Sequence, residues 1–377
     1  MVVVAREKVH KMSLAYRNLF QNKTRLILSI AGVGLSVTLI LVLNGFLSGV
    51  YRQASAYLDN TPGSVVIVQR GVHNFLSSNS TLPPGTVKSV AEEEEVSKVV
   101  PITSRFVIFE LHDEKQGAQA VGYDPESGGG PWRLAEGRGV RTDNEVVVDL
   151  ALAKTHHIST GDELTVAGRD FSVVGVSEGT SIWAAGLMFF SKRATGDMIR
   201  APDATSLLLV TPDEGIAPEA LRDRLSDVPG TNVMLKSQLI SNDEDLVARA
   251  FIGPLRLMVG IALLVGALVV GLIIYTATME RQKEYGVLKA VGARNRVLYQ
   301  LITTQALITA GVGAVAGVGF ACGTAQLIMA LRPEFLIAIE PGAAGWGLLM
   351  GLVMALLGAL FPARVVAQLA PAEVYRR

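Results

Sequence analysis

The charged side chains best placed to do chemistry lie in one short segment, from Thr278 to Arg296, between two long runs without charge. The runs are 257–277 and 297–331, and each is long enough to cross a bilayer as a helix. Charged side chains at the ends of such helices lie at the membrane face, where their chemistry is ionic recognition of a soluble partner. The segment therefore indicates a coupling device rather than an active site.

A helical conformation would give this segment two distinct faces. Ionic residues recur at i, i+3 and i+4 from Glu280, aromatic and aliphatic residues begin at Tyr285, and Gly292 suits a C-cap. Eight residues are the candidates for contact with a partner: Glu280, Arg281, Lys283, Glu284, Tyr285, Leu288, Lys289 and Gly292. The spacing alone fits equally well an ordinary positive-inside loop that only fixes the topology.

Other residues capable of ligand chemistry have simpler explanations. His156 and His157 are adjacent, so their side chains point in different directions and do not favour a shared metal site. The consecutive carboxylates 92–95 cannot converge on one ion from a regular helix, and we expect a solvated helix face. The acidic residues 243–245 are expected at a helix N-terminus, where the dipole favours carboxylates. We therefore expect no metal and no cofactor bound by this chain.

Signatures of catalysis are missing from the sequence. It contains no GxxxxGK[ST] phosphate loop, no HExxH and no GxSxG, and its one cysteine, Cys322, lies inside an apolar run. A chain of this kind is expected not to be an enzyme and not to hydrolyse ATP by itself. Its formal net charge of zero argues against a nucleic-acid partner.

The elements that must position these residues are those of an α-helical membrane protein. Half of the 377 residues are hydrophobic, and 38 are glycine. Four runs without Asp, Glu, Lys or Arg reach the roughly 20 residues that a helix needs to cross a hydrocarbon core of about 30 Å. They predict transmembrane helices at 26–51, 255–279, 297–331 and 341–363.

The distribution of cations predicts the orientation. Six cations and one acid precede the first span, and further cations lie in the turn 280–296 and after the fourth span. The positive-inside rule then places both termini in the cytoplasm of a cell whose plasma membrane the chain crosses. The expected cytoplasmic parts are an amphipathic arm at 1–25, a coupling helix at 280–296 and a tail at 364–377. The first run is longer than a signal-peptide core and is expected to remain as an anchor.

The segments expected outside the membrane are a large domain at 52–254 and a short loop at 332–340. Runs rich in β-branched residues predict strands at 64–69, 145–148, 163–166, 171–176 and 206–210. Helices are predicted at 86–97 and 218–226. The fold class expected is therefore four transmembrane helices with one extracytoplasmic α+β domain, free of disulfides, inserted between the first two.

Three stretches carry a family resemblance. They are ERQKEYGVLKAVGARNR at 280–296, NEVVVDLALAKTHHISTGDELTVAGRDFSVVGV at 144–176 and PARVVAQLAPAEVYRR at 362–377. Together, and in this order, they resemble the FtsX-like, MacB-type family of ABC transporter permeases, with Tyr375 where leucine is common. The resemblance implies a permease that forms a dimer, expected as a homodimer with a heterodimer left open, and binds a separate cytoplasmic ATPase, which holds ATP and Mg. It also implies mechanotransmission from the ATPase to the outer domain.

Pairs of small residues four positions apart agree with close helix packing. They are Gly45 and Gly49, Gly313 and Gly317, Gly319 and Gly323, and Gly347 and Gly351. Such pairs let helix backbones approach closely in lipid, which suits either a dimer seam or a tight bundle.

With its compact outer domain, the chain as a whole looks most similar to the short four-span branch that contains heme-efflux permeases of Gram-positive bacteria. That resemblance implies efflux of a hydrophobic or amphipathic substrate, with heme as leading candidate, taken up at the outer ends of the first two spans. A tetrapyrrole needs apolar walls, a cation for its propionates and a ligand near iron. The residues that could supply them are Phe46, Tyr51, Tyr57, Arg249, Phe251, Arg256 and Met258. Aromatic and basic residues are also ordinary anchors at this membrane depth.

Two alternatives to efflux of a small molecule follow from the same family. One is an FtsX-like mechanical regulator of an extracellular cell-wall hydrolase, whose outer domain would be a docking surface. The other is a permease that releases lipoproteins or peptides. A membrane-tethered enzyme is disfavoured because no nucleophile, base and orienting group are recognisable in the outer segment.

Overall fold

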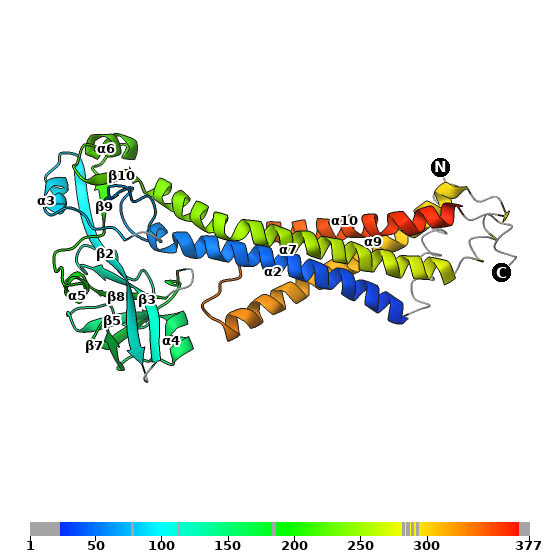
Figure 1. Ribbon diagram of the computed structural model, residues 1–377, viewed down its shortest axis with the longest axis horizontal. Helices are drawn as coiled ribbons and strands as arrows, with labels where there is room; N and C mark the ends of the chain where they lie inside the picture. Colours follow the sequence, from blue (N-terminus) through cyan, green and yellow to red (C-terminus); the bar gives the residue numbers. More distant parts are fainter. Residues whose placement is uncertain are drawn as a thin grey trace. The chain divides into compact units, whose positions relative to one another are not determined.

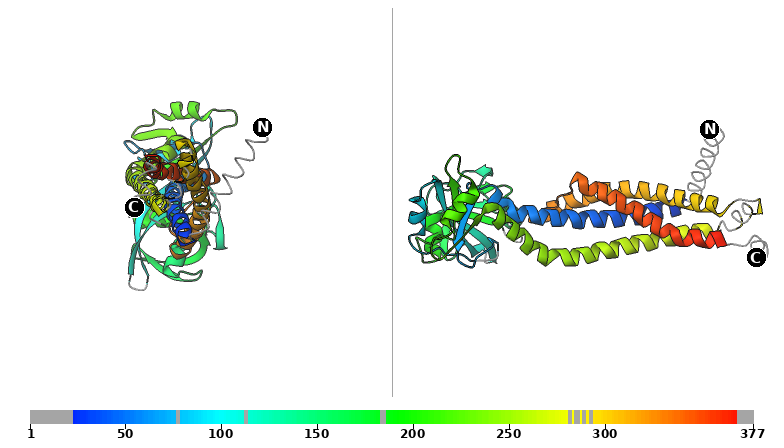
Figure 2. Two further views of the ribbon diagram at one scale, coloured as in Figure 1. Left: turned by 90° about the vertical axis from the view of Figure 1, so that its right-hand side faces the viewer. Right: turned by 90° about the horizontal axis from the view of Figure 1, so that it is seen from above.

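Four long helices are apolar enough to cross a membrane among the residues that the structure describes. The computed structural model describes residues 23–76, 79–111, 114–182, 186–280, 283, 287, 290, 291 and 294–368. The four helices are α2 (Lys23–Asp59), α7 (Lys236–Glu280), α9 (Asn295–Leu331) and α10 (Pro341–Gln368) (Figures 1 and 2). The expected architecture of four membrane helices, with an α+β domain inserted between the first two, is confirmed.

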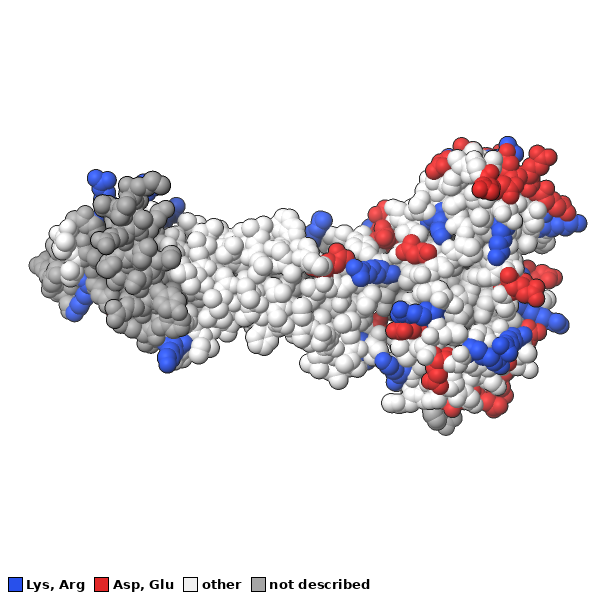
Figure 3. All heavy atoms as spheres, turned by 180° about the vertical axis from the view of Figure 1, so that it is seen from behind, with Lys and Arg blue, Asp and Glu red and all other residues white. Residues whose placement is uncertain are grey.

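The chain divides into two compact units. A helical unit comprises residues 1–48, 252–327 and 337–377, and an αβ unit comprises residues 49–251 and 328–336. On the face that Figure 3 shows, Lys, Arg, Asp and Glu side chains gather over the αβ unit, and the middle of the helical unit presents uncharged atoms. This is the surface expected of helices that face lipid.

Small residues bring the helices of the helical unit close together. A Cβ added at Gly317 of α9 would lie 2.6 Å from the carbonyl oxygen of Gly34 on α2. The Thr38 hydroxyl donates a hydrogen bond to the carbonyl of Gly317 at 3.0 Å, which joins the same two helices. A second close approach joins α7 to α10, where a Cβ at Gly271 would lie 3.1 Å from the carbonyl oxygen of Gly358. Glycines thus form the helix contacts of this unit.

Two helices extend well beyond the apolar runs that predicted them. α2 continues past Tyr51 to Asp59, and α7 begins at Lys236 rather than near residue 255. The extra turns are stabilised by burial in the αβ unit, where Leu58 and Leu239 are fully buried. The acidic residues 243–245 therefore lie inside α7, and the expected helix N-terminus at that position was wrong.

The αβ unit is built on one ten-stranded sheet with the order β10-β1-β9-β2-β3-β8-β5-β7-β4, in which β6 pairs with β2 and β7. The strands are β1 (Val65–Gln69), β2 (Val96–Leu111), β3 (Glu114–Tyr123), β4 (Leu134–Gly137), β5 (Glu145–Asp149), β6 (Glu163–Val166), β7 (Arg169–Ser177), β8 (Leu187–Ser191), β9 (Leu207–Pro212) and β10 (Thr231–Leu235). The pairs β3–β8 and β5–β7 are parallel, and every other pair is antiparallel.

Strand β2 joins the two halves of this sheet. Its first half, up to Ile102, pairs with β9, and its second half, from Thr103, pairs with β3. Four short helices cover the sheet: α3 (Thr86–Ala91), α4 (Leu150–His156), α5 (Lys192–Met198) and α6 (Pro218–Leu225). The helix predicted at 86–97 is shorter than expected, because the chain turns at Glu95, with φ of 74°, into β2. The carboxylates 92–95 therefore do not form a helix face.

Candidate functional site

The expected coupling segment joins α7 to α9 within the helical unit. α7 ends at Glu280, and Lys283, Val287 and Ala290 are helical and exposed. Val287 accepts a backbone hydrogen bond from Val291, whose side chain is 85% exposed. The remaining candidates lie outside the described residues: Arg281, Glu284, Tyr285, Leu288, Lys289 and Gly292. The described part of the segment therefore presents one acid, Glu280, three cations and apolar side chains to its surroundings.

The seven candidate substrate residues are divided between the two units. The helical unit contains Phe46, Arg256 and Met258, and the αβ unit contains Tyr51, Tyr57, Arg249 and Phe251. Arg249, Arg256 and Met258 are exposed, whereas Phe46, Tyr51 and Phe251 are half-buried. The seven residues thus do not form one site within either unit.

Tyr57 is part of the core of the αβ unit. Its side chain is fully buried, and its hydroxyl donates a hydrogen bond to the carbonyl of Gly129 at 2.9 Å. Its ring stacks on Phe75 with the centroids 5.2 Å apart. Burial raises the pKa of Tyr57 far above its ordinary value. The expectation that Tyr57 lines a substrate site conflicts with this packing.

Helical geometry separates the other candidates on α7 into two sets. Arg249 and Arg256 are seven positions apart and share one face, as do Phe251 and Met258. The two sets are offset by two residues, which is roughly 200° around a helix. The arginines and the apolar pair therefore face nearly opposite directions, and a single ligand cannot contact both sets from this helix.

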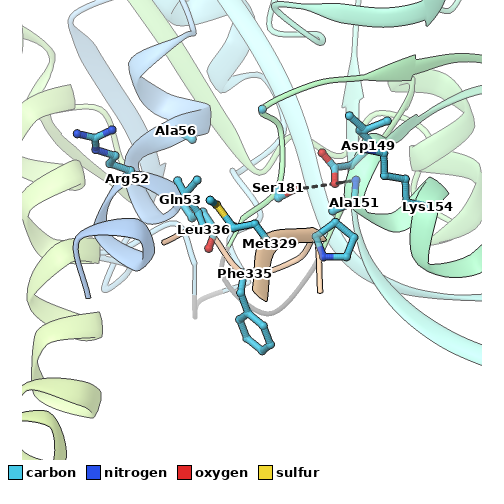
Figure 4. A pocket seen from close by; sticks show the side chains of 13 residues that line it. Arg52, Gln53, Ala56, Asp149, Ala151, Lys154, Ser181, Met329, Phe335 and Leu336 are labelled. Carbon is cyan, nitrogen blue, oxygen red and sulfur yellow. Dashed lines mark hydrogen bonds between the residues drawn. The ribbon is translucent and has the colours of Figure 1, made fainter. Parts of the chain in front are cut away.

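A cavity of about 370 Å³ lies in the αβ unit, where sequence reasoning placed no site (Figure 4). Its walls come from α2, from α4 with the residues just before it, from the loop after β7, and from the segment 329–336. The lining residues are Arg52, Gln53, Ala56, Asp149, Leu150, Ala151, Lys154, Gly179, Ser181, Met329, Pro333, Phe335 and Leu336. Gln53 donates a side-chain hydrogen bond to the carbonyl of Glu334 at 3.0 Å, which ties α2 to the last of these walls.

Asp149 is the buried acid of this cavity. Its carboxylate caps α4 by accepting the backbone N–H of Ala151 at 2.9 Å. The hydroxyls of Thr180 and Ser181 donate to its two oxygens at 2.7 Å each. Figure 4 shows Ser181 and Ala151 meeting the carboxylate from two sides. Both oxygens are thus occupied, so the role of Asp149 here is to fix the start of α4. The sequence signal was an acid directly between a valine-rich strand and an alanine-rich helix.

Comparison with known proteins identifies the family of this chain. The sequence matches the description MacB-like periplasmic core domain over residues 26–228 and the description FtsX-like permease C-terminal over residues 256–371. An uncharacterized ABC transporter permease of Mycobacterium tuberculosis is 25% identical over 334 residues, which cover 87% of this chain and 89% of that protein. The uncharacterized ABC transporter permease YknZ of Bacillus subtilis is 22% identical, with 98% of this chain and 99% of that protein covered.

Two further matches align with a smaller share of the matched protein or of this chain. The macrolide export ATP-binding/permease protein MacB of Wolinella succinogenes is 23% identical over 97% of this chain and 60% of its own length. Among solved structures, the periplasmic region of MacB from Actinobacillus actinomycetemcomitans aligns with a TM-score of 0.38 and 15% identity, covering 50% of this chain and 95% of that one.

The fold is that of a multi-pass membrane protein whose large α+β domain lies between the first and second of four membrane helices. Because the first family match covers more than half of its residues, the chain belongs to the family of MacB-like, FtsX-like ABC transporter permeases. Membership in this family implies a cytoplasmic ATPase as partner.

Proposed function

We propose that this chain is the permease subunit of an ABC-type efflux transporter. It couples ATP hydrolysis by a separate cytoplasmic ATPase to the extrusion of a hydrophobic or amphipathic substrate from the membrane, and heme is the leading candidate. The observation that carries the proposal is α7, which runs as one helix from Lys236 in the αβ unit through the apolar run to Glu280 at the coupling segment. A movement imposed at Glu280 can therefore reach the αβ unit along a single element.

The coupling step assigns a role to the segment after α7. With both termini in the cytoplasm, the ATPase would contact Glu280, Lys283 and their neighbours, and closure of the ATPase pair around ATP and Mg would move this segment. The exposed side chains of Lys283 and Val287 are suited to such contact, because one offers a charge and the other apolar surface.

The substrate step uses the outer ends of α2 and α7. Since the two arginines and the apolar pair of α7 face opposite directions, we assign the propionates of heme to Arg249 and Arg256. Apolar contact with the ring would then come from Phe46 and Tyr51 of α2. Tyr57 is left out of this site because it is buried.

The test is the ATPase rate of the purified permease with its ATPase in lipid nanodiscs, titrated with heme and with unrelated amphiphiles. We expect saturable stimulation by heme, which falls about tenfold in apparent affinity or more when Arg256→Ala is combined with Tyr51→Ala. Arg133→Ala, an exposed cation of the αβ unit, is the control and should change nothing. Stimulation by heme that survives the double substitution would remove these residues from the site, and a flat response would remove heme.

A second candidate is the mechanical regulator of an extracellular hydrolase. Phe106 and Ile108 on β2 are 61% and 54% exposed and share one face of the strand, which suits a protein-docking surface. Replacing both with serine should release a docked hydrolase without changing ATPase stimulation. If the hydrolase stayed active in the Phe106 and Ile108 variant and lost activity only when the coupling segment was altered, its docking surface would lie elsewhere on the permease. A permease that releases lipoproteins or peptides remains the third alternative.

A further inference from the structure

A short loop segment of the αβ unit is fastened to α7 and to β10 by side chains of these two elements. We call residues Val72–Leu76 the strap. The Oδ1 atom of Asp243 accepts the backbone N–H groups of Phe75 at 2.9 Å and of Leu76 at 3.0 Å. The amide of the neighbouring Asn242 donates to the carbonyl of His73 at 2.7 Å. Asn232 of β10 donates to the carbonyl of Val72 at 2.7 Å. The strap is therefore held by a small set of side-chain bonds.

The underside of the strap is only partly packed. The ring of Phe75 stacks on Tyr57 with an interplanar angle of 13°. Beside it remains a hollow of about 20 Å³, whose polar walls include Ser80, Ser104 and Ser206. This space is sufficient for one water molecule. The hollow can therefore hold one water molecule beside the strap.

Asp243 is an unusual anchor because it is fully buried and only half satisfied. Its Oδ2 atom has no hydrogen-bond partner among the described residues. The residue lies in the αβ unit, well before the uncharged run that begins at Leu257. Burial raises the pKa of Asp243 to about 7, although the hydrogen bonds from Leu76 and Phe75 act in the opposite direction.

Among the described residues, the ionisable groups on the surrounding elements offer this carboxylate no compensating ion pair. His73 of the strap places Nδ1 3.2 Å from the side-chain amide of Asn232. Lys236 on α7 donates its Nζ proton to the carbonyl of Thr61 at 2.8 Å. Tyr57 on α2 stacks on Phe75 of the strap, and Glu244 and Asp245 directly follow Asp243 on α7. An ionised Asp243 is thus a buried charge balanced by two amides alone.

We propose that the strap is a proton-operated latch on α7, closed while Asp243 is protonated and released when Asp243 ionises. Burial of an ionised carboxylate that has one oxygen without a hydrogen bond is unfavourable in free energy. Lifting the strap would let water hydrate this oxygen. The pKa of Asp243 is raised in the closed form, whereas in the open form it returns toward about 4. Closure is therefore strongest below pH 4, weakens as the pH rises to about 7, and changes little above that. The latch would make the αβ unit respond to the pH outside the cell, whichever substrate the permease exports.

The test is hydrogen exchange of the Phe75 and Leu76 amides in the full-length permease in nanodiscs, corrected for intrinsic rates. We expect protection about tenfold or more greater at pH 5 than at pH 8. Asp243→Asn should make protection equal at the two pH values. Glu244→Gln, its neighbour on α7, should leave the wild-type difference unchanged.

A further variant separates fastening from titration. Asn242→Ala removes one bond to the strap and leaves the carboxylate in place, so protection should fall at both pH values while their ratio persists. Equal protection of the wild-type amides at pH 5 and pH 8 would overturn the latch, and this result needs no variant. If Asp243→Asn kept the wild-type ratio of protection between pH 5 and pH 8, another group would be the one that titrates. That result would also overturn the latch.

Discussion

Two carboxylates of the αβ unit show how burial and partners set opposite charge states. Glu145 of β5 is nearly buried, like Asp243, but it receives a bidentate contact from the guanidinium of Arg138 at 2.7 and 2.8 Å. The backbone N–H groups of Arg141 and Thr142 also point to its Oε2 atom. The hydrogen bonds from Arg138 lower the pKa of Glu145 to about 2. The contacts of Glu145 thus favour its ionised form, whereas the burial of Asp243 favours its neutral form.

Arg138→Met should destabilise the αβ unit at pH 7, because a nearly buried carboxylate loses its cation. The pKa of Glu145 is depressed in the folded state, so its stabilisation is present above about pH 4.5 and lost as the pH falls toward 2. The penalty should therefore shrink steadily below pH 4. The loss of stability is measured by denaturant titration of the purified chain, with hydrogen exchange of the β5 amides as the signal.

The control for this prediction is Arg133→Met. Arg133 forms an ion pair with Glu178 at 3.2 Å, but both side chains are about half exposed. Exposed ion pairs contribute roughly 0–1 kcal/mol, so we expect almost no effect at either pH. An equal loss of stability in the two variants would show that the burial of Glu145 does not strengthen its ion pair with Arg138.

Among the elements, the sequence predicted those that have strong local signals. The valine-rich strands β5 and β7 were expected, and both were found. The ten residues of β3, EKQGAQAVGY, contain a single β-branched residue and gave no strand signal. β3 is a strand because it pairs with β2 on one side and with β8 on the other, which a local pattern cannot reveal. The site residues show the same limit, since the sequence placed Tyr57 near the end of the first span and Asp243 at a helix N-terminus but could not show that both are buried.

The coupling segment gives a prediction for one element. Glu280→Lys together with Glu284→Lys should leave insertion and folding intact but reduce stimulation of the ATPase to the rate of the ATPase alone. The reason is that contact with the soluble partner changes sign while no apolar surface is lost. ATP hydrolysis by the reconstituted pair measures the effect. Glu94→Lys, an exposed acid of the αβ unit, is the matched charge reversal and should have no effect. Stimulation at the normal level in the double variant would contradict a coupling role.

At the scale of the whole molecule, the glycine pairs differ in how they are used. Gly313 and Gly317 pack against α2, and Gly351 packs against Ala314 of α9. A Cβ added at Gly319 or Gly323 would meet nothing within 4 Å. We propose that this open pair on α9 lies in the seam of the dimer that the family resemblance implies.

Gly319→Ile combined with Gly323→Ile should weaken dimerisation about tenfold, because bulky side chains hold the two backbones apart. Energy transfer between labelled permeases in vesicles measures the dimer fraction. Gly342→Ile combined with Gly345→Ile is the control, since these glycines of α10 are equally open. A dimer fraction that does not respond to the α9 pair would exclude this face from the seam.

The length of α7 sets a mechanical limit on the whole assembly. Its 45 residues extend over about 67 Å, at a rise of about 1.5 Å per residue. Pro254 lies inside the helix and cannot donate a backbone hydrogen bond to the preceding turn, so bending stiffness is lowest there. This compliant point falls between Phe251, the last residue of the αβ unit on this helix, and the start of the apolar run at Leu257. Under the proposed coupling, work done at the Glu280 end of α7 would be divided between rigid displacement of the helix and elastic strain at Pro254.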